Sequence, residues 1–370
     1  MEILEGGMTN KWMSMFTKDE SNIVAEDVIP RTKIMTASPS LNWAMNGGFY
    51  RGFTICLYGP EGSGKSLTSL IAIAALHQSD PEAIAVLIST EMRPPTPERL
   101  RVLGIDPGRL IIRQKNTLHD VFDWIESGDS IFTNSDGSKK GSGLRYVLEQ
   151  GAPIKALAID SIKGIVGPRE QDSKSSEKEI MGDLSRFLNP ALRRVLPVIR
   201  QYELMTIFVQ QVNINMNADE VKYQNKKYVI PSGQSLKHFC ENMALIERVN
   251  AKDSKIFSEE MKGVRKLPVQ EGHTIRIKVD KANLDKPFRE AEYRIHYGKG
   301  VVDQGIEVAL LATGLGVIFH PIAKSSGKPN KMMWQFGDQN WKGFDNLCHD
   351  LDEKPELQRE IMAAVYDLDK

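Results

Sequence analysis

The sequence has few cysteines, no net charge and no long apolar run, and each absence excludes a class of protein. The three cysteines among 370 residues are far apart and form no CxxC pair, so we expect reduced thiols rather than a disulfide framework or a zinc site. The 48 basic and 48 acidic side chains cancel, so a polyanionic partner would have to be held by local patches. No run approaches the ~18 apolar residues of a membrane span. The first residues lack the basic and apolar parts of a secretory signal, so we expect a cytoplasmic protein with no membrane partner.

Short apolar runs separated by helical stretches dominate the middle of the chain. Strands that are buried on both faces of a sheet have this almost continuous apolar pattern. With helices between them, the runs predict an α/β fold with a mostly parallel central sheet. Two later segments, residues 273–281 and 290–298, alternate apolar and polar residues and predict antiparallel strands with one wet face. The four apolar runs are residues 53–58, 83–89, 154–160 and 204–212.

Changes in composition divide the chain into three predicted parts. Residues 1–30 are polar and rich in methionine, which predicts an arm that serves oligomerisation. Residues 31–300 carry the strand and helix pattern and predict the core domain. Residues 301–370 have a mixed, largely helical pattern, which predicts a small C-terminal α+β domain.

Three polar segments interrupt the core. Residues 127–150 are rich in Gly, Ser and Lys and predict a surface insertion. Residues 165–180 and 213–234 lack helical or strand periodicity, and loops this long inside a compact domain are usually functional. Between these two loops, Asn189 followed by Pro190 predicts the start of a new helix.

The stretch "LYGPEGSGKSLTSL" places three glycines, a lysine and a serine between a buried strand and an apolar helix. It satisfies GxxxxGK[ST], in which glycines free the backbone N–H groups to surround phosphate oxygens at the positive end of a helix. Lys65 would neutralise the β- and γ-phosphates, and Ser66 would ligate Mg²⁺. The alternative, a glycine-rich turn with a chance lysine, is disfavoured because both flanks match. The residues expected to bind ATP here are Gly59, Pro60, Glu61, Gly62, Ser63, Gly64, Lys65, Ser66 and Leu67.

Polar side chains stand where three of the predicted strands end. Asp160 ends one apolar strand, a position from which a carboxylate reaches Mg²⁺ through water. Glu91 follows another and could take the proton of an attacking water, while a glutamine amide, from Gln210 or Gln211, could sense the γ-phosphate. Without the phosphate loop, each carboxylate would be better explained as a solvated or turn residue.

Together and in this order, these elements resemble the RecA family of strand-exchange recombinases, in particular the phage-encoded branch that includes UvsX. The resemblance spans about residues 31–346. It is carried by "SPSLNWAMNGGFYRGFTICLYGPEGSGKS", "STEMRPPTPERLRVLGIDPGRLI", "ALAIDSI", "TIFVQQV" and "PSGQSLKHF". Its most discriminating part is "IRIKVDKANLDKPFREAEYRIHYGKGVVDQG", which is unlike the corresponding part of other P-loop ATPases.

The resemblance implies a DNA-dependent ATPase with ATP and Mg²⁺ bound at the boundary between subunits. Such a protein polymerises as a helical filament on single-stranded DNA and exchanges strands with double-stranded DNA, alongside mediator or single-strand-binding proteins. Glu91 would be the catalytic base, Gln211 the γ-phosphate sensor and Asp160 the carboxylate on the metal side. Lys281 would reach ATP across the subunit boundary, with Lys237 at the same interface.

This sequence departs from the family pattern at three places. Asn283 stands where a second trans-acting lysine is expected, and Lys286 is an unaligned substitute. Arg99 stands where an aromatic residue usually stacks on adenine, after a segment one residue longer, so adenine recognition would differ. The insertion at residues 127–150 lengthens the span between the phosphate loop and the metal strand.

The resemblance also places residues 165–180 and 213–234 against DNA. Between Gln211 and Cys240 there are four lysines and two acidic residues, whereas residues 161–180 hold four of each sign. A single subunit would therefore bind DNA poorly, and affinity would come from repeating the basic patch along a filament. Tyr223 and Tyr228 could stack on bases or pack on their own loop. The expected DNA-binding residues are Arg169, Lys174, Asn213, Lys222, Tyr223, Lys226, Lys227, Tyr228 and Lys237.

Two other functions stay open at this point. A hexameric DNA helicase with the same core would form closed rings and use an arginine finger. A non-catalytic scaffold, gated by nucleotide, would bind DNA with negligible turnover, which DNA-stimulated ATP hydrolysis would exclude.

Overall fold

The computed structural model describes residues 31–137, 141–172, 183–224, 227–231, 233–251, 254–257, 269–322 and 327–368. The expected N-terminal arm, Lys174 and Lys226 lie outside these ranges. No helix within them is long and apolar enough to cross a membrane.

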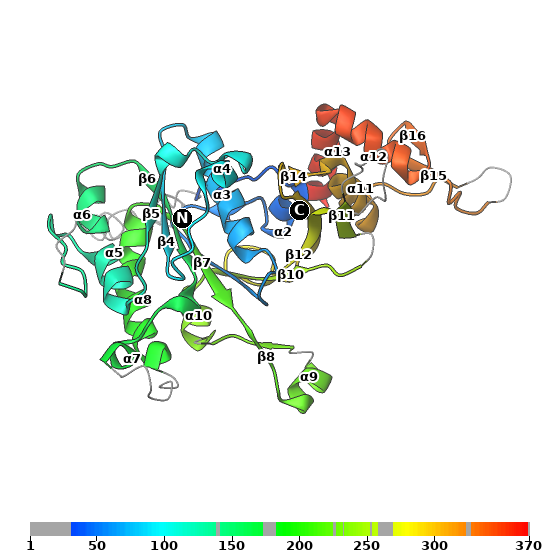
Figure 1. Ribbon diagram of the computed structural model, residues 1–370. Coiled ribbons are helices and arrows are strands. Elements are labelled where there is room, and N and C mark those ends of the chain that lie inside the picture. The colour runs from blue at the N-terminus through cyan, green and yellow to red at the C-terminus, as the bar shows by residue number, and fades with distance from the viewer. Residues whose placement is uncertain are drawn as a thin grey trace, which may run out of the picture. The chain divides into compact units, whose positions relative to one another are not determined.

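A ten-stranded mixed sheet runs through the core (Figure 1). Six neighbouring strands are parallel, in the order β10-β3-β7-β6-β4-β5. The four apolar runs of the sequence form β3, β4, β6 and β7, which confirms the predicted parallel sheet. The bounds of the six are Thr54–Gly59 (β3), Ile84–Ser89 (β4), Leu110–Arg113 (β5), Ile154–Asp160 (β6), Met205–Gln211 (β7) and Asn242–Arg248 (β10).

Antiparallel strands extend the sheet beyond β10. These are β12 (Gln270–Ala282), β13 (Glu290–His296) and β14 (Gly300–Val302), with β11 (Lys255–Phe257) paired to β12. The two alternating segments of the sequence form β12 and β13, as predicted. The sequence did not single out β5 and β10, because β5 is short and β10 mixes apolar with polar side chains.

Helices cover both faces of the sheet. On β3, Ile55 and Leu57 join the core cluster that contains α3 (Lys65–Ser79), whereas Cys56 and Tyr58 join the cluster that contains α8 (Asp183–Gln201). This division follows from the period of two along a strand. The other helices of this part are α2 (Pro39–Ala44), α4 (Pro97–Val102), α5 (Trp124–Glu126), α6 (Leu144–Glu149), α7 (Pro168–Asp172) and α10 (Gly233–Phe239).

The predicted helix start at Asn189–Pro190 is wrong, because α8 continues through this pair and through Pro197. Leu188, Leu192 and Ile199 are all fully buried along one side of α8. The packing of this apolar face on the sheet outweighs the local preference of proline for a helix start.

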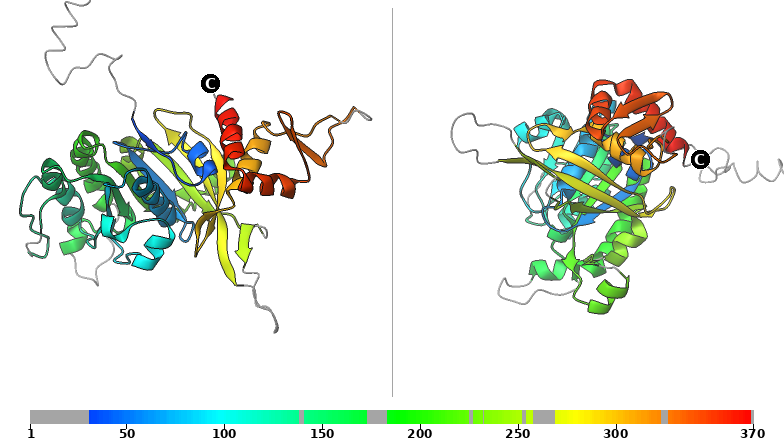
Figure 2. Two further views of the ribbon diagram at one scale, coloured as in Figure 1. Left: turned by 90° about the horizontal axis from the view of Figure 1, so that it is seen from above. Right: turned by 90° about the vertical axis from the view of Figure 1, so that its right-hand side faces the viewer.

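The C-terminal part lies beside the antiparallel strands (Figure 2). Its helix α11 (Gln304–Gly314) packs on α2 and β13, and the buried carboxylate of Glu307 accepts hydrogen bonds from Ser38 Oγ (2.6 Å) and from Ser40 N (3.2 Å). A domain boundary near residue 300 stays a prediction. Further elements are β1 (Lys33–Ile34) paired with β2 (Phe49–Tyr50), β15 (Met333–Phe336) paired with β16 (Gln339–Lys342), α12 (Phe344–Glu353) and α13 (Pro355–Asp367).

Candidate functional site

The glycine-rich segment forms the predicted turn between β3 and α3. β3 ends at Gly59, and α3 begins at Lys65 after Gly64, whose φ of 103° favours glycine. A Cβ atom at residue 64 would lie 2.5 Å from Ile275 Cδ1, and one at residue 59 would lie 2.1 Å from the Ile246 oxygen. Both glycines are therefore required for this backbone path, which leaves the N-terminus of α3 open to an anion.

Lys65 lies inside this turn and is only 5% exposed. Its Nζ donates hydrogen bonds to the Pro60 oxygen and to Ser63 Oγ, the latter at 3.3 Å. Burial lowers the pKa of Lys65 to about 8, although the nearby carboxylates of Asp160, Glu61 and Glu91 raise it. A bound phosphate would add negative charge beside the ammonium group and stabilise its protonated form.

Asp160 and Ser66 meet where β6 ends opposite the start of α3. The pKa of the Asp160 carboxyl group is raised, chiefly by burial and further by Glu91, although the Ser66 hydroxyl and Lys65 act to lower it. One carboxylate and one hydroxyl fit Mg²⁺, which takes few protein ligands and completes its shell with water and phosphate oxygens. Among the described residues, no three His, Cys, Asp or Glu side chains form a metal cluster.

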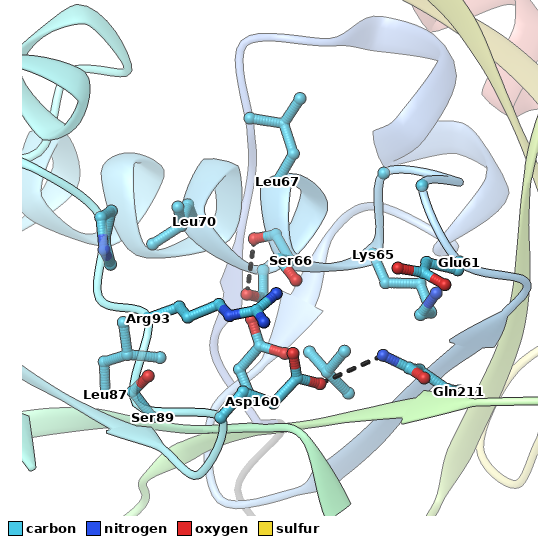
Figure 3. A pocket seen from close by; sticks show the side chains of 16 residues that line it. Glu61, Lys65, Ser66, Leu67, Leu70, Leu87, Ser89, Arg93, Asp160 and Gln211 are labelled. Atoms are coloured by element: carbon cyan, nitrogen blue, oxygen red, sulfur yellow. Dashed lines mark hydrogen bonds between the residues drawn. The ribbon is translucent and has the colours of Figure 1, made fainter. Parts of the chain in front are cut away.

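Glu91 lies beside the ends of β6 and β7. Its Oε1 accepts a hydrogen bond from Gln211 Nε2 at 3.1 Å, drawn as the dashed line at Gln211 in Figure 3. It accepts a second one from Ser161 Oγ, also at 3.1 Å. Gln210 is 1% exposed, and its amide donates to the Gln211 oxygen at 2.8 Å. The structure thus places Gln211, rather than Gln210, next to Glu91.

A cavity of about 430 Å³ is lined by Lys65, Ser66, Asp160, Glu91 and Gln211 among others. Arg93, which the sequence analysis missed, lines this cavity. Arg99 was expected to bind the cofactor, but it lies on α4 and donates a hydrogen bond to the Tyr297 oxygen. The lining residues are Glu61, Gly62, Gly64, Lys65, Ser66, Leu67, Ser69, Leu70, Leu87, Ser89, Glu91, Arg93, Pro95, Asp160, Val209 and Gln211.

Lys281 and Lys237 lie together, away from this cavity. Lys281 Nζ donates to the Lys237 oxygen at 2.6 Å and to the Cys240 oxygen at 2.7 Å. Both lysines line a second cavity of about 890 Å³, as do Tyr58 and Asp280. Within one protomer, neither lysine is a lining residue of the cavity at the phosphate loop.

The segment after Gln211 is a hairpin rather than the predicted loop. β8 (Asn213–Ile214) pairs with β9 (Tyr228–Val229), and α9 (Ala218–Gln224) lies between them, beyond the end of β7 (Figure 1). Apolar side chains are exposed on it, with Ile214 75% and Met216 91% accessible. This exposure is typical of a surface that binds another molecule.

The predicted DNA-binding residues of the hairpin fall into two groups. Asn213, Lys222, Tyr223 and Lys227 are exposed, and Lys222 Nζ lies 5.2 Å from the centroid of the Tyr223 ring. Tyr228, in contrast, is half-buried and donates its hydroxyl to Glu247 Oε1 at 2.9 Å, so it fastens the hairpin to β10.

The first predicted DNA loop is described only in part. Val166 forms an isolated bridge with Thr117, and Arg169 is exposed on α7. Lys174, further along this segment, lies outside the described residues.

Comparisons with known proteins agree with this arrangement. The family model "RecA N-terminal domain" matches residues 19–302. Protein RecA of Thermus aquaticus is 26% identical over 343 residues, which cover 92% of this chain and 85% of that protein. Protein RecA of Nostoc punctiforme is 26% identical over 338 residues (91% and 80%), and that of Geobacter sulfurreducens is 25% identical over 346 residues (93% and 88%). The match to the family model spans most of the sheet and every element of the phosphate site, and the chain therefore belongs to the RecA family.

Proposed function

We propose that this chain is an ATP-dependent DNA recombinase that polymerises as a helical filament on single-stranded DNA and catalyses homologous pairing and strand exchange. The observation that carries the proposal is the position of Gln211. Its side chain bonds to Glu91 in the cavity, and the hairpin with its exposed apolar and basic side chains begins two residues later. A change at the γ-phosphate would therefore reach the hairpin directly.

The cavity supplies the groups that ATP hydrolysis requires. Glu91 takes a proton from a water molecule whose oxygen forms a bond to the γ-phosphorus. The bond from the γ-phosphorus to the β,γ-bridging oxygen breaks, its electron pair stays on that oxygen, and ADP and inorganic phosphate leave. Lys65 and the N–H groups of the phosphate loop neutralise the phosphate oxygens. Mg²⁺, held by Ser66 and Asp160, would supply further positive charge when bound.

The Gln211 amide connects hydrolysis with DNA binding. In the structure it donates to Glu91 at 3.1 Å. A γ-phosphate competes for the same amide proton and offers a charged acceptor, so it shifts Gln211 away from Glu91. Because Gln211 ends β7, this shift changes the backbone that enters β8.

Self-assembly accounts for the two lysines that lie apart from the cavity. Lys281 and Lys237 would face the nucleotide of a neighbouring copy, so ATP would hold two subunits together until hydrolysis removes the γ-phosphate. Each copy contributes a hairpin in which Lys222, Lys227 and Tyr223 are exposed. Binding along DNA would then sum over subunits and weaken with salt.

The proposal includes the phage-encoded, UvsX-like branch and action in the host cytoplasm, with mediator or single-strand-binding proteins as partners. Support comes from the quoted motifs. An identity of 26% to a bacterial RecA protein is low enough for this chain to belong to a separate branch of the family.

Electron microscopy with single-stranded DNA and a non-hydrolysable ATP analogue tests the proposal. Open helical filaments are expected, and they should disappear in the Lys65→Ala variant, which cannot hold the phosphates. Closed hexameric rings would instead indicate a helicase. Protomers that stay isolated in the presence of both nucleotide and DNA would overturn the proposal. In a separate assay, an absence of DNA-stimulated ATP hydrolysis would favour a non-catalytic scaffold.

A further inference from the structure

Arg93 is a cation in the cavity to which neither the phosphate-loop motif nor the family resemblance gives a role. It lines the cavity together with Ser66 and Asp160, and its side chain extends into the cavity on their side (Figure 3). The side chain is exposed. Within the described part of the chain, no hydrogen bond or ion pair of its guanidinium group is found. The group is therefore available to a ligand in the cavity.

The backbone presents Arg93 in a fixed position. Directly after β4, Thr90 Oγ1 donates to the Ser161 oxygen (2.7 Å) and accepts from Ser161 N (2.8 Å). Met92 has a φ of 56°, a left-handed conformation that few residues other than glycine adopt. Two prolines follow Arg93 and restrict both their own φ and the conformation of Arg93. Thr96 then caps α4 by accepting from Arg99 N.

These restraints hold the backbone of Arg93 beside the cavity, so little backbone entropy remains to be lost when its side chain meets a ligand. Unfavourable backbone conformations such as that of Met92 also cluster at functional sites. The turn thus fixes where the backbone of Arg93 lies, and the side chain extends from there into the cavity.

The acidic lining of the cavity means that a bound triphosphate would need a second cation besides Lys65. Its lining has three carboxylates, those of Glu61, Glu91 and Asp160, and two cations, Lys65 and Arg93. Lys65 already donates to two oxygen atoms of the phosphate loop. A triphosphate brings several further negative charges into this acidic site, and a guanidinium group can bind two phosphate oxygens at once.

We propose that Arg93 contacts the β- and γ-phosphates of the nucleotide bound by its own subunit and stabilises the negative charge that develops there during hydrolysis. This inference rests on the proposed function for the identity of the ligand. It adds a cation from the same subunit to one that Lys281 would bring from a neighbour. Arg93 is then a catalytic residue, since it touches the reacting phosphate.

The test compares Arg93→Ala, Arg93→Lys and the matched control Arg101→Ala, because Arg101 is exposed on the adjacent helix α4 with its side chain 64% accessible. Two quantities are measured for each variant and the parent: the dissociation constants of ATP, ADP and AMP with Mg²⁺, and kcat for ATP hydrolysis with single-stranded DNA. Circular dichroism and thermal unfolding check that each variant is folded.

Arg93→Ala should weaken ATP binding by about 10- to 150-fold, the usual effect of losing a charged hydrogen bond, and leave AMP binding unchanged, with ADP in between. Its kcat should fall by about 10²-fold or more, the effect of losing one preorganised donor to the transition state. Arg93→Lys should retain part of the ATP affinity and part of kcat, because lysine keeps the positive charge but lacks the planar guanidinium group that can bind two oxygens. Arg101→Ala should match the parent.

Two outcomes overturn the inference. Unchanged ATP affinity and kcat in Arg93→Ala would show that the guanidinium group does not touch the phosphates. An equal loss of ATP and AMP affinity would place the contact at the base or ribose. A parent that binds ATP tightly without hydrolysing it would contradict the proposed function alone, and the contact of Arg93 would then be judged by the affinity ratios.

Discussion

Gln211 donates its side-chain amide to the carboxylate of Glu91 at 3.1 Å, although 120 positions separate the two residues in the sequence. The contact exists because β4 and β7 flank β6 in the sheet, so the chain segments that leave their ends run close together. One bond thus joins the candidate base to the strand that enters the hairpin. The first two predictions test its two ends.

Glu91→Gln should keep nucleotide binding and lose turnover. The amide preserves the shape of the side chain but cannot take a proton, so kcat should fall by about 10²–10⁴-fold. Steady-state ATP hydrolysis and equilibrium ATP binding measure the two effects. Glu98→Gln, an exposed substitution on α4, is the control. Hydrolysis at the parental rate in Glu91→Gln would refute the role of the base.

Gln211→Ala should separate ATP binding from DNA binding. Loss of the amide removes the connection between γ-phosphate and hairpin, so single-stranded DNA affinity should become nearly equal with ATP and with ADP. Fluorescence anisotropy of labelled DNA in each nucleotide measures this ratio. Gln201→Ala, at the exposed end of α8, is the control and should show the same ratio of DNA affinities as the parent. A variant that still prefers DNA strongly in ATP would show that Gln211 is not the sensor.

The two tyrosines of the hairpin should behave differently. Tyr223 is 74% exposed, so Tyr223→Ala should weaken single-stranded DNA binding by about 1–3 kcal/mol if its ring stacks on a base, without a change in stability. Tyr228→Phe removes the hydroxyl that binds Glu247 and should destabilise the hairpin by about 1 kcal/mol.

Anisotropy and amide hydrogen exchange of residues 213–229 measure the two effects. Tyr223→Phe serves as the matched control, because it removes a hydroxyl but keeps the ring. If Tyr223→Ala loosened the hairpin while Tyr228→Phe did not, the assignment of the two residues would be reversed.

Stability should fall as the pH rises from about 4.5 to about 8 because of Glu307. Burial raises the pKa of Glu307 to about 8, well above its ordinary value of 4.5. The folded state therefore keeps a proton that the unfolded state releases. The resulting stabilisation is complete below about pH 4.5 and is lost as the pH rises through about 8.

Glu307→Gln imitates the protonated form and removes this dependence. The melting temperature of the variant minus that of the parent should accordingly rise between about pH 5 and pH 9, as thermal unfolding across this range will show. Glu360→Gln, an exposed substitution on α13, should give a flat difference. A flat difference for Glu307→Gln as well would mean that the carboxyl group ionises in the folded protein as it does in the unfolded one.

Residue pattern alone predicted much of the fold and the phosphate end of the site. The continuous apolar runs identified four of the six parallel strands, and the alternating segments identified β12 and β13. The motif around Lys65 placed the turn and the start of α3 correctly. These features are local, since they depend on residues within one strand or one turn of each other.

Features that depend on distant segments were missed or left open. Asn189–Pro190 favoured a helix start locally, yet α8 continues because its apolar face packs on the sheet. The aperiodic segment after Gln211 forms a hairpin whose return strand is held by Glu247, a residue of another strand.

The sequence by itself determined the buried strands, the phosphate loop and the residue types at the strand ends, because backbone geometry and side-chain period act over a few neighbouring residues. Only the tertiary structure decided which glutamine meets Glu91, that Arg93 rather than Arg99 lines the cavity, and that Tyr228 faces the sheet while Tyr223 faces solvent. The physical reason is that strand order, and not distance along the chain, sets which side chains converge.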